Sequence, residues 1–373
     1  GVMSGFVLTA EAADIFHEDG QKHTYTAVDA GKVTAYKGSE IELSGGTITS
    51  IKEAHVDPED DRVGYADVSA ESGGAGSKIV ANNADFKGEV HASTGGTIIL
   101  NGGSVTSGTF YDKDGNSIED YPTEIGSRGE GAYVELNKVK IDSNLGAFEG
   151  AELTVNDSNV NADTAIYAEG GTINLISTDG KAKYVVGEEG VWAEAGGVIN
   201  INGGGTFEAF DNNNLPECYE QKGMPFVASD GGTINIDSNN NKPTIVAGLG
   251  VYDAHANIKG DVEFQDGNIN VRASDSSKSS TVVTESGSKL SAADLQVFGE
   301  GSSFTANGIV DLSHIDAMSG AKVTLNGGKV DYTKEEKDDK VLPGIWWDSA
   351  ALADYANLTA NNVDFVGDVR AYM

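Results

Sequence analysis

The chain has 373 residues, 58 of them acidic and 25 basic, and its formal net charge of −33 disfavours nucleic acid and anionic membrane as partners. Its single cysteine, Cys218, excludes a disulfide framework and a metal-thiolate cluster. Because Ile, Val, Leu and Phe together make up only 84 of the 373 residues, about 23%, a packed core requires them to recur at regular positions.

The chain begins with GVMSGFVLTAEAADIF, a short apolar run that ends at Ala10, Glu11 and Ala12. Signal peptidase cleaves after small residues two apart, so residues 1–13 are predicted to be the remnant of a secretory signal peptide. An N-terminal strand is the alternative. Residues 14–373 are expected to form one continuous repeat domain, with an N-terminal cap over about 14–36 and a truncated C-terminal end.

The segment HEDGQKH lies at the centre of this cap. His17 and His23, with Glu18 nearby, are residue types that bind metals, but they lie six positions apart in a polar stretch. That spacing is poor for ligands of one ion, so the segment is interpreted as a solvated loop without a metal.

The segment 151–176, AELTVNDSNVNADTAIYAEGGTINLI, contains one complete repeat and the start of the next. Leu153 and Ile173 open successive repeats, which gives a period of 20 residues. Alternate residues of a strand point the same way, so the apolar positions predict three short strands separated by Asn, Asp and Gly corners. Repeats of this length predict an all-β fold, a single-stranded parallel β-helix (β-solenoid) with three short strands per rung of about 20 residues.

Two apolar patterns support this prediction along the chain. The pattern of the first strand has apolar residues at i, i+2 and i+7, and its copies are Ile41/Leu43/Ile48, Ile79/Ala81/Phe86, Ile98/Leu100/Val105, Val134/Leu136/Ile141, Leu153/Val155/Val160, Leu290/Ala292/Val297, Val323/Leu325/Val330 and Leu358/Ala360/Phe365. The copies of the third strand are Val68/Ala70, Val90/Ala92, Ile166/Ala168, Val191/Ala193, Phe226/Ala228 and Val369/Ala371.

Four polar excursions interrupt the rungs, at 55–62, 110–128, 210–224 and 330–343. The second contains Asp112, Lys113, Asp114, Gly115 and Asn116, which begin like a calcium loop. Ser117 and Thr123 replace the glycine and the bidentate glutamate of such a loop, so no calcium site is expected.

The outward positions of the strands offer two features. Asn174, Asn200 and Asn235 occupy equivalent central positions of the first strand and are interpreted as a hydrogen-bonded ladder, with a polar binding face as the alternative. The outward position of the third strand contains Ser69, His91, Tyr167, Trp192 and Val227, and similar segments add Tyr252 and Trp346.

Aromatic residues in such a row either stack on sugar rings and apolar partner surfaces or stack on each other as scaffold. Tyr167, Trp192, Tyr252 and Trp346 are therefore the candidate binding surface. No nucleophile elbow, Walker loop, zinc-protease motif or Cys-His pair is present, so no catalytic residues, metal ligands or cofactors are predicted.

The segments AIYAEGGTINL, GVWAEAGGVININGGGTF and FVASDGGTINI resemble the passenger regions of Gram-negative autotransporters, the type V secreted adhesins, over nearly the whole chain. The resemblance implies a right-handed parallel β-helix, export to the cell surface or outer membrane or into the medium, and anchoring by a C-terminal β-barrel that this sequence lacks. No protease triad of that family can be matched here.

The leading hypothesis is a non-enzymatic, adhesin-like passenger that binds host-cell or bacterial surface glycans or proteins, with self-association left open. A secreted polysaccharide-active β-helix enzyme, a lyase or glycosidase, is the first alternative, and a convergent carboxylate cleft would favour it. A purely structural cell-surface stalk is the second.

Overall fold

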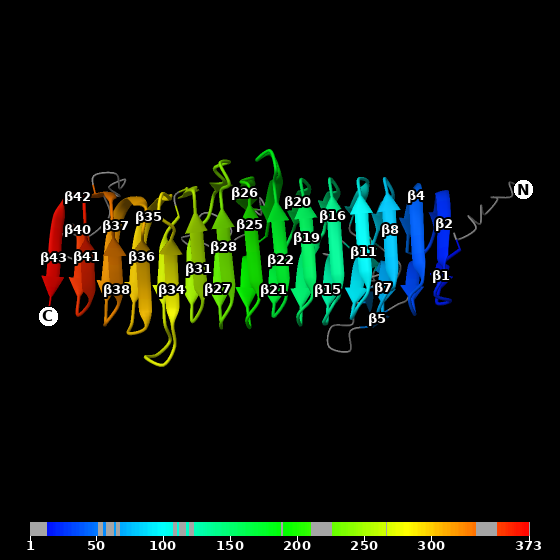
Figure 1. Ribbon diagram of the computed structural model, residues 1–373, viewed down its shortest axis with the longest axis horizontal. Helices are drawn as coiled ribbons and strands as arrows, with labels where there is room; N and C mark the ends of the chain where they lie inside the picture. The colour runs from blue at the N-terminus through cyan, green and yellow to red at the C-terminus, as the bar shows by residue number, and fades with distance from the viewer. Residues whose placement is uncertain are drawn as a thin grey trace, which may run out of the picture.

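The computed structural model describes residues 13–50, 55–56, 63–64, 68–106, 110–111, 117–118, 123–187, 189–209, 226–265, 267–332 and 349–372. Its strands stand side by side along one long axis, with the first and last described strands at opposite ends of the rod (Figure 1). Among these residues, thirty-nine strands form one sheet, and every strand pairing within that sheet is parallel. The predicted parallel β-helix is therefore confirmed.

Each rung contributes a strand to each of three stacks. The first stack contains β2 (Lys22–Ala30), β4 (Glu40–Thr49), β8 (Lys78–Asn82), β11 (Thr97–Asn101), β16 (Tyr133–Asn137), β19 (Glu152–Asn156), β22 (Thr172–Ile176), β25 (Val198–Asn202), β28 (Thr233–Asp237), β31 (His255–Lys259), β34 (Ser280–Thr284), β36 (Ser302–Ala306), β38 (Lys322–Leu325) and β41 (Asn357–Ala360).

The second stack continues from the ends of β2 and β4. It contains β9 (Asp85–Lys87), β12 (Ser104–Thr106), β17 (Lys140–Asp142), β20 (Asn159–Ala162), β23 (Lys183–Val186), β26 (Thr206–Ala209), β29 (Thr244–Ile245), β32 (Asp261–Phe264), the first parts of β35 (Lys289–Phe298) and β37 (Ile309–Met318), β39 (Gly328–Asp331) and β42 (Val363–Val366).

The third stack completes each rung. It contains β1 (Ile15–His17), β3 (Val33–Tyr36), β7 (Val68–Gly73), β10 (Glu89–Ser93), β15 (Glu124–Arg128), β18 (Asn144–Phe148), β21 (Ala165–Glu169), β24 (Gly190–Glu194), β27 (Phe226–Ser229), β30 (Leu249–Tyr252), β33 (Ile269–Arg272), the last parts of β35 and β37, β40 (Ser349–Asp354) and β43 (Asp368–Tyr372).

The core consists of the inward residues of the three stacks. Leu153, Val155 and Ile166 are completely buried, and Leu153 pairs in register with Ile173 of the next rung. Because neighbouring rungs place equivalent residues side by side, a strand with only two inward side chains still closes its part of the core. This explains how a chain with few apolar residues folds.

Glycine pairs form the corner between the third strand and the next first strand. Gly170 has a φ of +65°, a backbone conformation that side chains disfavour. A Cβ on Gly171 would lie 2.5 Å from the carbonyl carbon of Ala147 in the previous rung. The first glycine therefore makes the turn, and the second allows the rungs to approach.

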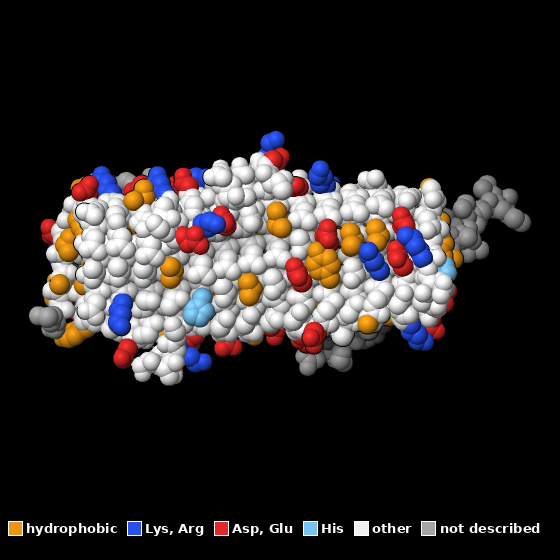
Figure 2. All heavy atoms as spheres, viewed as in Figure 1, with side chains coloured by type: hydrophobic (Ala, Val, Ile, Leu, Met, Phe, Trp, Pro, Cys, Tyr) orange, Lys and Arg blue, Asp and Glu red, His pale blue; other side chains and the backbone are white. Residues whose placement is uncertain are grey.

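Side-chain amides form ladders along the outer face of the first stack. Asn200 Nδ2 donates to Asn174 Oδ1, Asn235 to Asn200, and Asn257 to Asn235, each over 2.8 Å. The expected ladder is confirmed and extends one rung further. In Figure 2 this side of the molecule is mainly uncharged, and many of its charged side chains lie along the two long edges.

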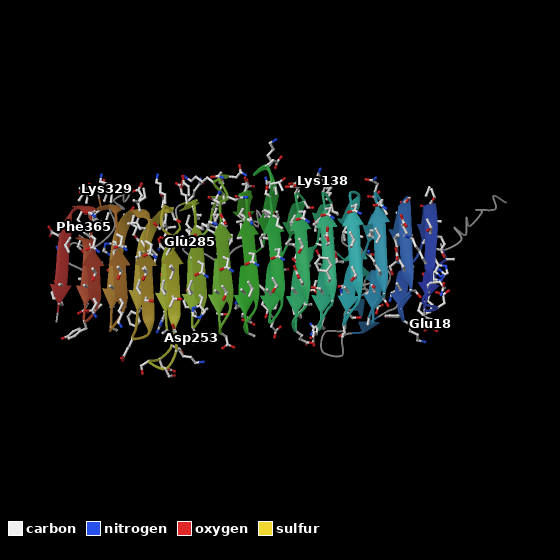
Figure 3. The ribbon with its side chains drawn as sticks, in the orientation of Figure 1. Glu18, Lys138, Asp253, Glu285, Lys329 and Phe365 are labelled. Carbon is white, nitrogen blue, oxygen red and sulfur yellow. The ribbon has the colours of Figure 1, made fainter. Side chains whose placement is uncertain are left out.

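Labelled charged side chains mark both long edges of the rod. Figure 3 shows Lys138 and Lys329 along one long edge, and Glu18 and Asp253 along the other. Among the described residues, no helix is long and apolar enough to span a bilayer.

Two of the predicted apolar pairs are corrected by the register. Val90 pairs with Ala70 after an irregularity in β7, so Ala70 and Ser72 point inward and Val68 does not. The copy at Leu290 is displaced by one strand, because Leu290 belongs to the second stack and Val297 to the third. Both errors arose because a bulge or a short corner shifts the phase without changing composition.

The segment 14–36, which was expected to form a cap, contributes strands to the β-helix itself. β1 pairs with β3, and β2 pairs with β4, both in parallel. At the other end Val369 of β43 aligns with Ala351 and is 54% exposed. Two short antiparallel pairs lie in and beside the first two excursions, β5 (His55–Val56) with β6 (Val63–Gly64) and β13 (Phe110–Tyr111) with β14 (Ser117–Ile118). The predicted excursion at 110–128 extends too far, because residues 124–128 form β15 of the third stack.

Several sequence predictions lie outside the described residues. They are the signal-peptide remnant except for Ala13, the Asp112 loop, Cys218 and its excursion, and most of the excursion at 330–343.

The inward and outward assignment predicts different costs for one substitution at adjacent positions. Ile234 is completely buried between Ile199 and Ala256, so Ile234→Asp should lower the free energy of unfolding by about 3–5 kcal/mol because the charge would have no partner. The neighbouring outward residue, Thr233, is the control, and Thr233→Asp should change it by only about 0.5 kcal/mol. Chemical denaturation measures both, and equal losses would contradict the assignment.

Candidate functional site: an aromatic cleft on the third stack

Two of the predicted aromatic residues are neighbours on the outer face of the third stack. Tyr167 on β21 pairs in register with Trp192 on β24. Their ring centroids lie 6.1 Å apart with the planes at 80°, and the Tyr167 ring also meets Phe148 edge to face at 5.9 Å. The repeat therefore brings these three rings together because equivalent positions of successive rungs are adjacent.

Hydrogen bonds hold the two rings in place. The Tyr167 hydroxyl donates to Glu194 Oε1 over 2.5 Å, and Trp192 Nε1 donates to Ser229 Oγ over 2.9 Å. Ser229 Oγ in turn donates to Glu194 Oε2 over 3.3 Å. Burial, followed by the bond to Glu194, raises the pKa of Tyr167, so its hydroxyl remains a donor at neutral pH.

Tyr252 does not belong to the same column. Gly250 is the residue of β30 that aligns with Val227 and hence with Trp192, whereas Tyr252 aligns with Ser229. The Tyr252 ring folds back over Gly250, where a Cβ would lie only 2.6 Å from it, and it is 41% exposed. The prediction of a shared column is therefore wrong for Tyr252, and Trp346 lies outside the described residues.

The register also changes the start of the column. Glu71, rather than Ser69, aligns with His91, and Gly126 and Gly146 follow before Tyr167. The two glycines leave the outer face open in front of the aromatic rings. Side chains from the flanking positions, Glu124 and Phe148, lie over that space.

The resulting hollow, the aromatic cleft, is about 350 Å³ in volume. It is lined by Glu124, Asn144, Leu145, Thr164, Ala165, Tyr167, Glu189 and Trp192. Asn144 Oδ1 accepts the backbone N–H groups of Thr164 at 3.0 Å and Ala165 at 3.1 Å, which fixes the corner before β21. Ring edges, an amide and two carboxylates thus converge on one concave site.

Glu124 is the most perturbed acid of this cleft. Burial raises its pKa and nearby Glu89 adds to the rise, while His91 and Arg128 oppose it. His91 lies 3.1 Å from Glu89 as an ion pair. Burial lowers the pKa of His91, but Glu89, Glu124 and Glu71 together more than offset this and leave it raised. The cleft therefore borders a row of carboxylates that share one histidine.

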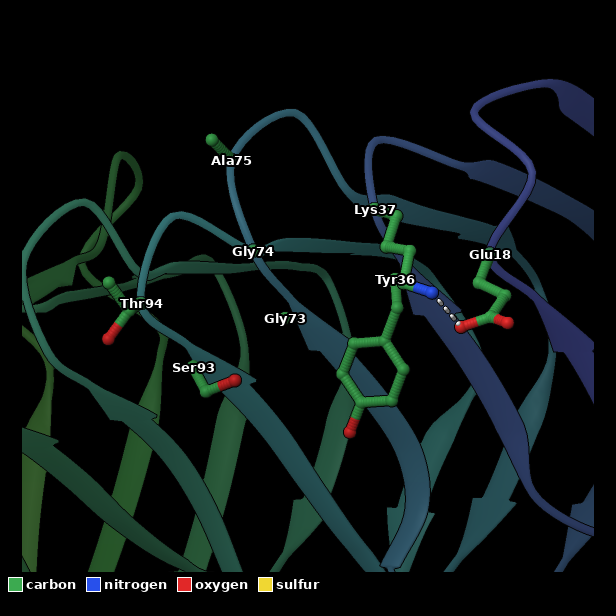
Figure 4. Close-up of a pocket in the computed structure, with 8 residues that line it drawn as sticks. All are labelled: Glu18, Tyr36, Lys37, Gly73, Gly74, Ala75, Ser93 and Thr94. Carbon is green, nitrogen blue, oxygen red and sulfur yellow. Dashed lines mark ion pairs between the residues drawn. The ribbon is translucent and has the colours of Figure 1, made fainter.

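A second hollow lies on the same side of the rod near the N-terminal rungs. It measures about 560 Å³ and is lined by Glu18, Tyr36, Lys37, Gly73, Gly74, Ala75, Ser93 and Thr94. Figure 4 shows the Tyr36 ring over Gly73 and the ion pair of Lys37 with Glu18, which is 2.8 Å long. This hollow is wider and more open, but only one aromatic ring lines it.

The Tyr36 hydroxyl donates to Glu71, and Lys32 Nζ lies 2.5 Å from the other oxygen of that carboxylate. Burial and the bond to Glu71 raise the pKa of Tyr36 to about 12. The hydroxyl therefore has a partner already, and this side chain is structural at neutral pH.

The outer face of the first stack has a narrow groove beside the asparagine ladder. Asn174, Asn200, Asn235 and Asp237 line about 290 Å³ there. The ladder bonds use the amide groups of the three asparagines, which leaves few free donors for a ligand. This groove is a weaker candidate than the aromatic cleft.

Sequence reasoning missed Glu124, Asn144, Glu189 and Phe148. The apolar pattern did not identify β15 and β18 as third strands. In β15, Ser127 stands at the inward position that is usually alanine, and in β18, Gly146 stands before that alanine. Their inward residues Ile125 and Leu145 are completely or almost completely buried, so a search for a single apolar residue 19 to 21 positions before Ile166 would have found Leu145.

No protein-family model, curated protein or solved structure matches this chain.

The raised pKa of Glu124 has a consequence for stability. Since the folded pKa lies above the unfolded one, the folded state binds the proton more tightly, and this stabilisation is present at low pH and lost as the pH rises through the folded pKa. Glu124→Gln should therefore raise the melting temperature at about pH 8, with a smaller difference near pH 4.

Removing any one negative charge relieves some repulsion in a chain of net charge −33. Glu130→Gln is the control, because Glu130 is an exposed glutamate in the turn after β15. Calorimetric melting of both variants measures the difference. An equal shift in the two variants, or a lower melting temperature for Glu124→Gln at about pH 8, would contradict the account.

Proposed function

We propose that this chain is an exported, cell-surface β-helix of the autotransporter passenger kind, and that it acts as a non-enzymatic adhesin whose aromatic cleft binds glycans. The observation that carries the proposal is the pairing of Tyr167 with Trp192 in a concave site that also contains Asn144 and two carboxylates. Aromatic rings pack on the apolar faces of sugars, while amides and carboxylates accept or donate hydrogen bonds to hydroxyl groups.

The charge of the site narrows the class of glycan. Glu124 and Glu189 line the cleft, Glu194 lies behind Tyr167, and the chain as a whole is strongly acidic. Sialylated or sulfated sugars would meet like charge there. The expected ligand of the cleft is therefore a neutral or amine-bearing surface glycan. A protein surface is the other class of partner for the same face.

The scaffold interpretation has support of its own. Tyr167 and Trp192 contact each other and hydrogen-bond to Glu194 and Ser229, so they also stabilise the third stack. Truncating either ring should cost about 1–3 kcal/mol from the lost ring contact and hydrogen bond. A binding test must therefore be paired with a folding test.

The binding test uses Tyr167→Ala/Trp192→Ala on a glycan array, followed by titration of the strongest hit. We expect the double variant to bind at least about tenfold more weakly while keeping its β-sheet circular dichroism, because aromatic anchors dominate such interfaces. The control is Phe298→Ala/Tyr355→Ala, which removes two rings that are 40% and 68% exposed elsewhere on the rod. Equal losses in both double variants, or retained binding in the first, would exclude the cleft as the site.

One observation favours the enzymatic alternative. Glu124 has a raised pKa and shares a cleft with Glu189, and a polysaccharide-cleaving site needs an acid that is protonated near neutral pH beside a second carboxylate. In that case Glu124 would be the acid and Glu189 the base. Reducing-sugar and unsaturated-product assays on neutral polysaccharides test this alternative. If the chain cleaves such a polysaccharide and Glu124→Gln abolishes the cleavage, the chain is an enzyme and the adhesin proposal is wrong.

A further inference from the structure

The corner between β1 and β2 brings three potential metal ligands together. One ring nitrogen from each of His17 and His23 and one carboxylate oxygen of Asp19 lie within 4.8 Å of one another. The six-residue spacing that argued against a site is bridged because His17 ends β1 and His23 lies near the start of β2, so that only residues 18–21 turn the corner.

The two histidine rings are stacked face to face. Their centroids are 3.4 Å apart and their planes differ by 6°. Two imidazolium cations would repel each other in that arrangement, so at least one ring is neutral, which is the form that binds a metal ion.

Asp19 is held in place by a backbone group and a buried hydroxyl as well as by His23. Its Oδ1 accepts the Gln21 N–H at 3.0 Å and the Ser39 hydroxyl at 3.2 Å, and His23 Nε2 lies 3.0 Å from both oxygens. Ser39 is completely buried, and its hydroxyl also accepts the Gly20 N–H at 2.9 Å. The bond from His23 and then that from Gln21 lower the pKa of Asp19 to about 2, so it is ionised at neutral pH.

We propose that His17, Asp19 and His23 form a site for one first-row divalent transition-metal ion, of which Zn²⁺ is the member to test. Two imidazoles and a carboxylate are a typical donor set for such ions, and they leave a fourth position for water or a partner's ligand. Ser39 and Gln21 supply the outer contacts that orient the carboxylate.

Binding requires the histidine rings to tilt out of their parallel stack, so that the in-plane lone pair of one nitrogen from each ring points at the ion. Ligand atoms of a tetrahedral zinc ion lie about 3.3 Å apart, given bonds of about 2.0–2.1 Å. Both histidines must release their present bonds, His17 Nε2 from the Tyr25 hydroxyl at 2.7 Å and His23 from Asp19. The ion would then tie the third stack to the first at the N-terminal rung, and it would raise the melting temperature by mass action.

The test is titration of the purified chain with Zn²⁺ at about pH 7.5 in excess Mg²⁺, which occupies weak carboxylate sites. We expect one equivalent to bind, and we expect affinity to fall more than about tenfold in His17→Gln/His23→Gln and in Asp19→Asn. The latter variant can still accept from Ser39 and Gln21, so it keeps the corner folded. The control is His255→Gln, which removes a histidine that pairs with Thr281 far along the rod.

Two readouts decide the proposal. Loss of the tight equivalent in both site variants but not in the control, together with a zinc-dependent rise in melting temperature that both variants lack, supports it. Unchanged binding in either site variant, or zinc that excess Mg²⁺ displaces completely, overturns it. Neither result depends on the glycan proposal, because the two sites share no residue.

Discussion

The parallel register between successive rungs is the constraint on which this structure depends. Strands alternate their side chains with a period of two, so a rung that slipped by one residue would turn its inward residues outward. Complete burial of Ile173, Ile199 and Ile234 at one register position shows how closely the stack obeys this rule. The same register fixes the outer faces, where the asparagine ladder and the Tyr167–Trp192 pair both occupy equivalent positions of successive rungs.

The inward positions could be predicted from the sequence because they repeat, whereas the site could not. Ile166/Ala168 and Val191/Ala193 were identified correctly, and with them the adjacency of Tyr167 and Trp192. Tyr252 was misplaced because the segment GVYD is similar in sequence to GVWA, but its inward residues are Leu249 and Val251, which places Tyr252 one position beyond the column. The register of a strand is set by the length of the corner that precedes it, and a comparison of short sequence segments does not take that length into account.

Residues that line the cleft come from rungs with unusual outer positions. Gly126 and Gly146 supply no side chain to the column, so Glu124 and Phe148 lie over the space. A glycine gives no signal in a search for apolar repeats, and only the structure shows which neighbouring side chains fill its place. His17, Asp19 and His23 show the same limitation, since a corner between two strands joined residues whose spacing had argued against a site.

Hydrogen–deuterium exchange of the chain with and without its strongest array glycan tests the central claim most directly, because it locates a bound ligand without any substitution. The account predicts slower exchange in residues 164–169 and 189–194, around Tyr167 and Trp192, with the first stack unchanged. Protection confined to residues 198–202 and 233–237, beside the asparagine ladder, would place the ligand on the other face and contradict the account.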